Sequence, residues 1–309
     1  MRILVFGGSG QVGYYLVKSL KALGYSVYSV SRTATADLYC DTNYILDLAV
    51  CSTNDLYQLC DLIRPNVIIY LSAVHGASTS IVMNSSKHLY AMEKVNQVMP
   101  DELIRYCELK ACKFVFSSSS YVYSPIKNVI RYVSEDTPLL PLNIYGKQKA
   151  HVQLDLVQRI DNGFDGLNVV LFNNISRLRK PPFLIPRIID FLDSLLLGQF
   201  PSSTKLQLKS SRSIFDLSCT LDVVYIITQL VFRNATGNFI LGSGNTVSVL
   251  DVVDICFKCR GLSSAEYVLF EDESPANASC VSADNTKVLQ LLDAFSFKRP
   301  ELVLANLMT

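Results

Sequence analysis

A tyrosine and a lysine stand four residues apart in the segment 143–149, which reads Asn-Ile-Tyr-Gly-Lys-Gln-Lys. On a helix, side chains at positions i and i+4 lie on the same face. An ammonium group beside a phenol stabilises the phenolate, so Lys149 should lower the pKa of Tyr145 from its usual value of about 10. Tyr145 is therefore a candidate proton donor or acceptor near neutral pH.

Four consecutive serines, Ser117 to Ser120, follow the apolar run Phe114-Val115-Phe116. The run has the composition of a buried strand, and ligand crevices of open α/β sheets lie at the carboxyl ends of strands. Hydroxyl groups at this position are therefore candidate partners for Tyr145. The residues alone leave open which serine takes part.

Three glycines, Gly7, Gly10 and Gly13, connect the short apolar run 3–6 with a helical pattern over 14–23. In this context one glycine permits a tight turn, one lets a pyrophosphate approach the backbone, and one lets the helix pack on the strand. The N-terminus of the helix then offers free N–H groups to the phosphates. The spacing predicts a dinucleotide site.

The end of the second predicted strand, 26–30, indicates which dinucleotide is bound. An NAD site needs a carboxylate there to accept hydrogen bonds from the ribose hydroxyls, whereas this strand continues into Ser31 and Arg32. Arginine offers paired donors to a phosphate, so the pair favours the 2′-phosphate of NADP(H), with NAD(H) still possible. Asp47, after the run 44–46, is placed to accept a hydrogen bond from the adenine amino group.

The elements that must position these residues alternate along the first half of the chain. Helical patterns over 56–63 and 101–110 alternate with apolar strands over 67–71 and 113–116. Such strands predict an α/β fold with a Rossmann-type, doubly wound parallel sheet covered on both faces. After residue 165 the pieces shorten: a strand over 167–172, a helix over 186–197, a strand over 238–242 and a helix over 248–258. We expect a cofactor domain over 1–165 and a smaller α/β substrate lobe over 166–309, with some exchange of chain between them.

Composition excludes several classes of protein. The chain has 309 residues with 28 Lys and Arg against 27 Asp and Glu, and no basic block, which argues against nucleic acid as a partner. No apolar run reaches the roughly 18 residues of a membrane span, so a cytoplasmic protein is expected. Of nine scattered cysteines only Cys256 and Cys259 form a tight pair, and no second pair completes a metal site. We expect reduced cysteines and no metal.

Taken together, the motifs resemble the extended short-chain dehydrogenase/reductase family that acts on nucleotide sugars. The resemblance covers nearly the whole chain: the glycine loop, the segment 64–73, Asn96, the serine run, the segment 135–138 and the segment 143–149. It implies a Ser-Tyr-Lys triad that includes Tyr145 and Lys149. Because the family places its serine or threonine four residues before the tyrosine of a Val-Tyr pair, it selects Ser119, with Ser118 as the runner-up.

The resemblance also implies further contacts with cofactor and substrate. The remaining cofactor contacts are Gln11, Val12, Leu48, Leu71, Ser72, Ala73 and Lys149. The substrate contacts are Ser119, Ser120, Tyr145, Asn173, Arg187 and Arg212. The family's Arg-Asp-Phe motif is here Arg-Ser-Ile-Phe-Asp over 212–216, so the register of Arg212 stays open.

Several reactions occur in that family. Dehydratases carry Asp or Glu directly after the catalytic hydroxyl residue, where this chain has Ser120 and Tyr121, and an enzyme similar to GDP-fucose synthase would need a cysteine in 117–124. A 4-epimerase with a retained cofactor and a non-catalytic relative remain alternatives. The NADP preference favours an NADPH-dependent reductase of nucleotide-linked 4-keto-6-deoxy sugars, serving deoxysugar and lipopolysaccharide synthesis. The resemblance further suggests a homodimer formed through 101–110 and 145–160.

Overall fold

The computed structural model describes residues 1–34, 39–75, 85–201, 203–272 and 280–308, and within these residues seven parallel strands form the main sheet. Its strand order is β11-β7-β5-β4-β1-β2-β3. The strands are β1 (Arg2–Phe6), β2 (Ser26–Ser31), β3 (Thr42–Ile45), β4 (Val67–Tyr70), β5 (Lys113–Ser119), β7 (Gly166–Leu171) and β11 (Gly237–Leu241). Chain order runs outward from β1 in both directions, so the sheet is doubly wound. The predicted fold class is confirmed.

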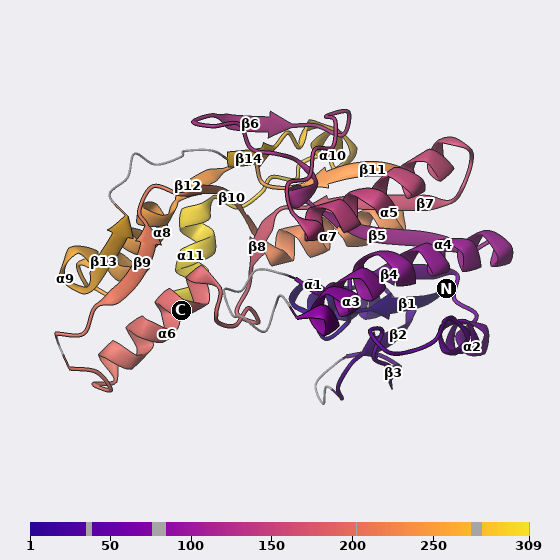
Figure 1. Ribbon diagram of the computed structural model, residues 1–309, viewed down its shortest axis with the longest axis horizontal. Helices are drawn as coiled ribbons and strands as arrows, with labels where there is room; N and C mark the ends of the chain where they lie inside the picture. Colours follow the sequence, from indigo (N-terminus) through magenta and orange to yellow (C-terminus); the bar gives the residue numbers. More distant parts are fainter. Residues whose placement is uncertain (35–38, 76–84, 202, 273–279, 309) are drawn as a thin grey trace.

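Helices cover both faces of this sheet (Figure 1). One face carries α1 (Gln11–Ala22), α7 (Thr220–Phe232) and α10 (Thr286–Leu291), and the other carries α2 (Thr53–Ile63), α4 (Met99–Lys110) and α5 (Ile144–Asp161). Strand side chains alternate between faces, so Ile3 and Val5 pack with α1 and α7 while Leu4 and Phe6 pack with α2 and α4. Both faces are buried, which explains the uninterrupted apolar strands.

The start of α5 is held against the end of β5. The Asn143 side chain caps the helix by accepting a hydrogen bond from the Gly146 N–H at 2.8 Å. A Cβ atom at Gly146 would lie 2.2 Å from the carbonyl oxygen of Tyr121, in the 3₁₀ turn η3 (Ser120–Val122) that follows β5. Glycine therefore allows the helix that carries Tyr145 to approach the serine run.

A second group of elements has its own apolar core and lies at one end of the molecule, away from β1 to β3 (Figure 1). It contains a three-stranded sheet of β12 (Thr246–Ser248), β10 (Ile214–Cys219) and β8 (Asn173–Ile175), and the pair β9 (Leu206–Ser210) and β13 (Val268–Asp272). Its helices are α6 (Leu184–Leu196), α8 (Val249–Cys259), α9 (Ser264–Tyr267) and α11 (Pro300–Met308). Between the two groups, β6 (Ile130–Val133) pairs with β14 (Cys280–Ala283).

The main sheet uses chain from both sides of position 165, because β7, α7 and β11 all follow it in sequence. The division into domains 1–165 and 166–309 remains a proposal.

The carboxylate of Asp216, on β10, is fully buried and joins three segments. It accepts hydrogen bonds from the Ser243 and Gly244 N–H groups at 3.2 and 3.0 Å and from the Ser243 hydroxyl at 2.9 Å. It also accepts hydrogen bonds from two groups of β14, the Ser282 hydroxyl at 3.1 Å and the Ala283 N–H at 2.9 Å. A buried carboxylate requires such partners, so Asp216 ties β10 to β14.

All nine cysteines lie in the described ranges and are free thiols. Burial raises the pKa of the Cys256 thiol to about 12. Among the described residues, no group of three or more His, Cys, Asp or Glu side chains is arranged to hold a metal ion. Nor does that part of the chain contain a helix with the length and apolar character needed to cross a bilayer.

Candidate active site

A cavity of about 330 Å³ lies at the carboxyl ends of β1, β4, β5 and β7, where the sequence predicted a ligand crevice. It brings together these predicted site residues: Gly7, Gly10, Gln11, Val12, Gly13, Leu71, Ala73, Ser119, Ser120, Tyr145, Lys149 and Asn173. His75, Tyr121, Arg179 and Phe183 also line it, and its described lining contains no aspartate or glutamate. Its charged side chains are therefore cations.

The tyrosine and the preferred serine of the predicted triad both line this cavity. Loss of water around the Tyr145 phenol raises its pKa to about 12, and the hydrogen bond with Ser119 opposes this rise only in part. The expectation that Lys149 would lower this pKa is therefore wrong for the structure, because desolvation dominates. Tyr145 is protonated at neutral pH. The Ser118 hydroxyl is buried without a partner among the described residues.

Lys149 is almost completely buried beside the strand end. Its ammonium donates a hydrogen bond to the Ser117 carbonyl at 2.8 Å and lies 4.5 Å from the centre of the Phe116 ring. Burial lowers the pKa of Lys149 to about 7. The same helix thus holds two neighbouring groups whose pKa values are both moved by desolvation, in directions that favour their neutral forms.

The glycine loop fits a dinucleotide pyrophosphate. Gly7 has a φ of +85°, and a Cβ there would lie 2.9 Å from the Ser72 nitrogen, while a Cβ at Gly13 would lie 2.2 Å from the Gly7 carbonyl oxygen. Helix α1 begins at Gln11 without a side-chain cap and without an acidic residue in its first turn. Its first N–H groups are therefore available to an anion.

The residues predicted to read the adenosine half lie outside the cavity lining. The Ser31 hydroxyl donates to the Thr33 carbonyl at 2.7 Å and accepts from the Asn43 amide at 2.9 Å, whereas Arg32 is exposed. Asp47 is exposed, and its carboxylate accepts a hydrogen bond from the Ala49 N–H at 2.9 Å. Leu48 is buried in the core between the sheet and helices α2 and α4. Ser72 lies against Gly7. Their roles toward the cofactor stay predictions.

The Gln11 side chain connects the glycine loop to the second lobe. Its Nε2 donates to the Asn174 side-chain and backbone oxygens at 2.7 and 2.9 Å, and its Oε1 accepts the Ser176 N–H at 3.3 Å. The Thr220 hydroxyl donates to the same Asn174 side-chain oxygen at 2.9 Å. The side-chain amide of Gln11 is engaged by Asn174 of β8 and by the N–H of Ser176 just after it, and its contact with the cofactor stays a prediction.

Two arginines predicted to bind substrate lie outside the cavity lining. Arg187 donates to the Gln207 carbonyl at 3.1 Å, and Arg212 is exposed. The cavity instead contains Arg179, whose guanidinium carbon lies 3.4 Å from the centre of the Phe183 ring. The sequence signal for Arg179 was the basic segment 177–180 between a strand and a helix, to which no role was given. Substrate roles for Arg187 and Arg212 stay predictions.

His75 was also missed. It follows β4 at the same edge of the sheet as the serine run, and that placement was the available signal. Val74, the residue before His75, is held by Asn96 of the π-helix η2 (Lys94–Val98). The Asn96 side chain donates a hydrogen bond to the Val74 carbonyl at 2.8 Å and accepts one from the Val74 N–H at 2.9 Å. The Asn96 amide also donates to Gln148 of α5 at 2.9 Å. The segment that carries His75 is therefore joined to the helix that carries Tyr145.

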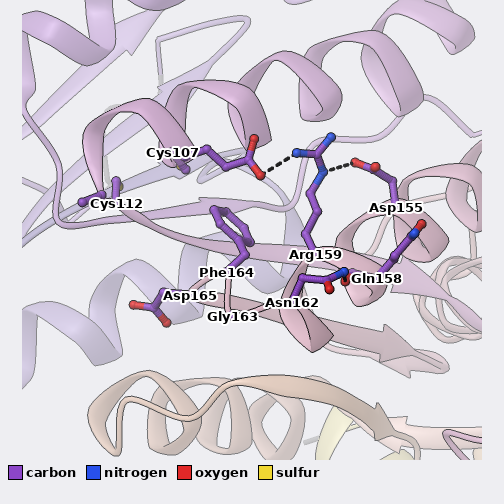
Figure 2. A pocket seen from close by; sticks show the side chains of 11 residues that line it. Cys107, Cys112, Asp155, Gln158, Arg159, Asn162, Gly163, Phe164 and Asp165 are labelled. Atoms are coloured by element: carbon purple, nitrogen blue, oxygen red, sulfur yellow. Dashed lines mark hydrogen bonds and ion pairs between the residues drawn. The ribbon is translucent and has the colours of Figure 1, made fainter.

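A larger cavity, of about 680 Å³, lies between the C-terminal ends of α4 and α5 (Figure 2). In it the Arg159 guanidinium bridges Glu108 at 2.5 Å and Asp155 at 2.8 Å. Cys112 and Asp165 directly precede β5 and β7, so this cavity lies at the amino ends of the strands. Ligands of such sheets bind at the opposite edge, and none of the residues in its lining belongs to the glycine loop or the triad.

Comparison with known proteins gives consistent matches. Residues 3–240 match the model of the NAD dependent epimerase/dehydratase family. A GDP-mannose 4,6 dehydratase of Dictyostelium discoideum is 23% identical over 273 residues, covering 82% of this chain and 74% of the relative.

Solved structures share the fold. The dTDP-glucose 4,6-dehydratase of Bacillus anthracis, in complex with NAD, has a TM-score of 0.81 at 17% identity, covering 100% of this chain and 95% of the other. RMD of Pseudomonas aeruginosa, complexed with NADPH, has a TM-score of 0.77 at 16% identity, covering 99% and 97%.

Proposed function

Since the chain belongs to the NAD dependent epimerase/dehydratase family, we propose that it is an NADPH-dependent reductase of nucleotide-linked sugars. It converts a 4-keto-6-deoxy sugar to the 4-hydroxy sugar, a step in the synthesis of deoxysugars and surface polysaccharides such as lipopolysaccharide. The observation that carries this proposal is the cavity itself, whose described lining contains a protonated tyrosine and Ser119 but no carboxylate.

The side chains of the cavity suit ketone reduction. The cofactor, when bound, supplies a hydride to C4 of the sugar. Tyr145 donates its proton to the oxygen on C4, which requires the protonated phenol that the raised pKa maintains. Ser119, in the same lining, holds the same oxygen in line. The ammonium of Lys149, donating to the Ser117 carbonyl, is placed to hold the nicotinamide ribose.

Dehydration is less well supported, although several relatives are named dehydratases. Removal of a proton beside a ketone and loss of a hydroxyl group call for an acid and a base at the sugar. Ser120 and Tyr121, the residues after Ser119, supply no carboxylate, and the described cavity lining supplies none elsewhere. Beyond the hydride that the cofactor supplies, reduction requires only the proton that Tyr145 holds.

The choice of NADPH rests on Arg32. Its exposed side chain directly follows β2, and the described residues after that strand, 32–34, include no carboxylate. A guanidinium there suits a 2′-phosphate. Of the two solved structures named above, one contains NAD and the other NADPH, so we infer the preference from this residue.

The test is turnover with defined substrates. Purified protein is given NADPH and either a GDP- or a dTDP-linked 4-keto-6-deoxyhexose, with Tyr145→Phe as the inactive control. Stoichiometric NADPH oxidation and a 4-hydroxy product are expected. Interconversion of ordinary UDP- or GDP-hexoses without net oxidation would identify a 4-epimerase instead. Formation of a 4-keto-6-deoxy product from GDP-mannose would identify a dehydratase, and binding of cofactor and sugar without any reaction would identify a non-catalytic relative.

A further inference from the structure

His75 stands against the two tyrosines of the cavity. Its ring centre lies 4.6 Å from that of Tyr145 at an interplanar angle of 44°, and 5.5 Å from that of Tyr121 at 86°. The imidazole is therefore packed beside the phenol that donates the proton. Its backbone position is set by the bonds between Asn96 and Val74.

The Nδ1 atom of His75 is buried and has no hydrogen-bond partner among the described residues. Buried polar atoms in folded proteins are nearly always paired, and an unpaired one costs free energy. His75 lines the cavity, so a bound molecule can reach it and supply the partner.

The charge state of the imidazole limits what that partner can be. Burial lowers the pKa of His75 to about 4, and the positive charges of Arg179 and Lys149 act in the same direction. Arg179 and Lys149 are the charged side chains of the described lining, and the rings of Tyr121 and Tyr145 pack beside the imidazole. A neutral imidazole has one donor and one acceptor nitrogen, so it suits a hydroxyl group better than an anion.

We propose that Nδ1 of His75 hydrogen-bonds the 3-hydroxyl of the sugar, and that His75 is thereby a residue that determines substrate specificity. This inference rests on the proposed function. Tyr145 and Ser119 hold the oxygen on C4, and the imidazole, tilted against the Tyr145 ring, is next to that position. In a 4-keto-6-deoxyhexose the neighbours of C4 are C3, which bears a hydroxyl, and C5, which bears the methyl group and the ring oxygen. The hydroxyl adjacent to C4 is therefore the one on C3.

Three substitutions distinguish the contribution of the Nδ1 hydrogen bond from that of the packed ring. In His75→Asn the amide stands close to the position of Nδ1, in His75→Gln it stands close to that of Nε2, and in His75→Phe the ring remains without nitrogen. The kcat and KM of each variant are measured with a GDP- or dTDP-linked 4-keto-6-deoxyhexose and with its 3-deoxy analogue, and NADPH affinity is measured separately. His151→Phe, on the exposed side of α5, is the control.

We expect His75→Phe and His75→Gln to lose about tenfold or more in kcat/KM, mainly through KM, as a lost buried hydrogen bond requires. His75→Asn should stay within about threefold of the parent, and all variants should bind NADPH normally. With the 3-deoxy analogue, parent and His75→Phe should be alike. If the ring served only as packing, His75→Phe would keep the parental kcat/KM and His75→Asn would lose it.

Two results would overturn the inference. One is a parental KM in His75→Phe, and the other is an equal loss of kcat/KM by that variant with the ketosugar and with its 3-deoxy analogue. A parent enzyme that oxidises no NADPH with either ketosugar would contradict the proposed function instead. In that case calorimetric binding of the ketosugar and its 3-deoxy analogue to parent and His75→Phe decides the contact by itself.

Discussion

Tyr145 is expected to hold the proton that completes the reaction. Removing a positioned general acid typically costs 10²–10⁴-fold in rate. Tyr145→Phe should therefore lose most turnover while NADPH binding, measured by fluorescence titration, is retained. Ser119→Ala should lose somewhat less. Ser118→Ala and Ser120→Ala should stay within about tenfold of the parent, and parental turnover by Tyr145→Phe would show that the triad is misassigned.

Arg32 is the second residue whose role can be measured directly. If its guanidinium binds the 2′-phosphate, Arg32→Asp should weaken NADPH binding several-fold to a hundredfold, about 1–3 kcal/mol for a charged hydrogen bond. NADH binding should change much less, because NADH lacks that phosphate. Calorimetric titration with both cofactors makes the comparison, and an equal loss for both would indicate a structural role.

Lys149 should make stability depend on pH. Burial lowers its pKa to about 7 in the folded protein, against 10.5 for an ordinary lysine. Between these values the unfolded chain binds the extra proton, so the contribution of Lys149 to the free energy of unfolding rises with pH by at most about 1.4 kcal/mol per unit. Denaturant unfolding between pH 7 and 9 should show this rise in the parent and in the exposed-site control Lys147→Met, but not in Lys149→Met. Identical pH profiles for all three would contradict it.

Residue types and spacing predicted part of this site. The four-residue spacing of Tyr145 and Lys149 and the spacing of the glycines each impose a local geometry, so sequence was sufficient to bring them to one cavity. The direction of the Tyr145 pKa shift could not be predicted, because it depends on water excluded by distant segments. His75 and Arg179 enter through packing of the chain around Asn96 and Phe183, which no local pattern records.

At the scale of elements, the bond between Gln11 and Asn174 joins α1 to β8. Gln11→Ala and Asn174→Ala each break the same contact, so each should raise the KM for the sugar nucleotide, and the double variant should be no worse than the more affected single one. Steady-state kinetics at saturating NADPH test this. If the effects of the two single substitutions on KM added fully in the double variant, Gln11 and Asn174 would act separately.

The elements of the main sheet were largely predictable, as were helices α6 and α8 of the second lobe, whereas the short strands of that lobe were not. Strands such as β1 and β5 have short, uninterrupted apolar runs next to clear helices, a pattern typical of buried parallel strands. Strands β8 and β12 have only three residues each, too few to show a period. Helix α7 escaped prediction because it is apolar on almost every side, so it lacks the polar face that marks a surface helix.

At the scale of the whole molecule, the main sheet should fail without its late strands. A fragment of residues 1–165 lacks β7, β11 and α7, and so exposes apolar side chains such as Val17 and Val115 that pack within the same core. We expect it to aggregate or to lack cooperative unfolding, as judged by size-exclusion chromatography and circular dichroism beside the full chain. A monodisperse, cooperatively folded fragment would show that the cofactor domain is independent.

The expected homodimer also belongs to this scale. Helices α4 and α5 contact each other and expose Leu109 and Leu154 at 77% and 59%. A second copy is the partner that the resemblance suggests for this face, and the assembly stays a prediction.

The bonds of Asp216 have a consequence for how the protein is made. The ribosome synthesises Asp216 long before Ser282 and Ala283, which supply two of its donors. Until those residues emerge, a nascent chain that had already formed β10 would bury an incompletely paired carboxylate, which is costly. The second lobe therefore reaches its final form only after residues 282 and 283 have been synthesised. A transcript cut short before codon 283 would yield a polypeptide that cellular proteases recognise as unfinished.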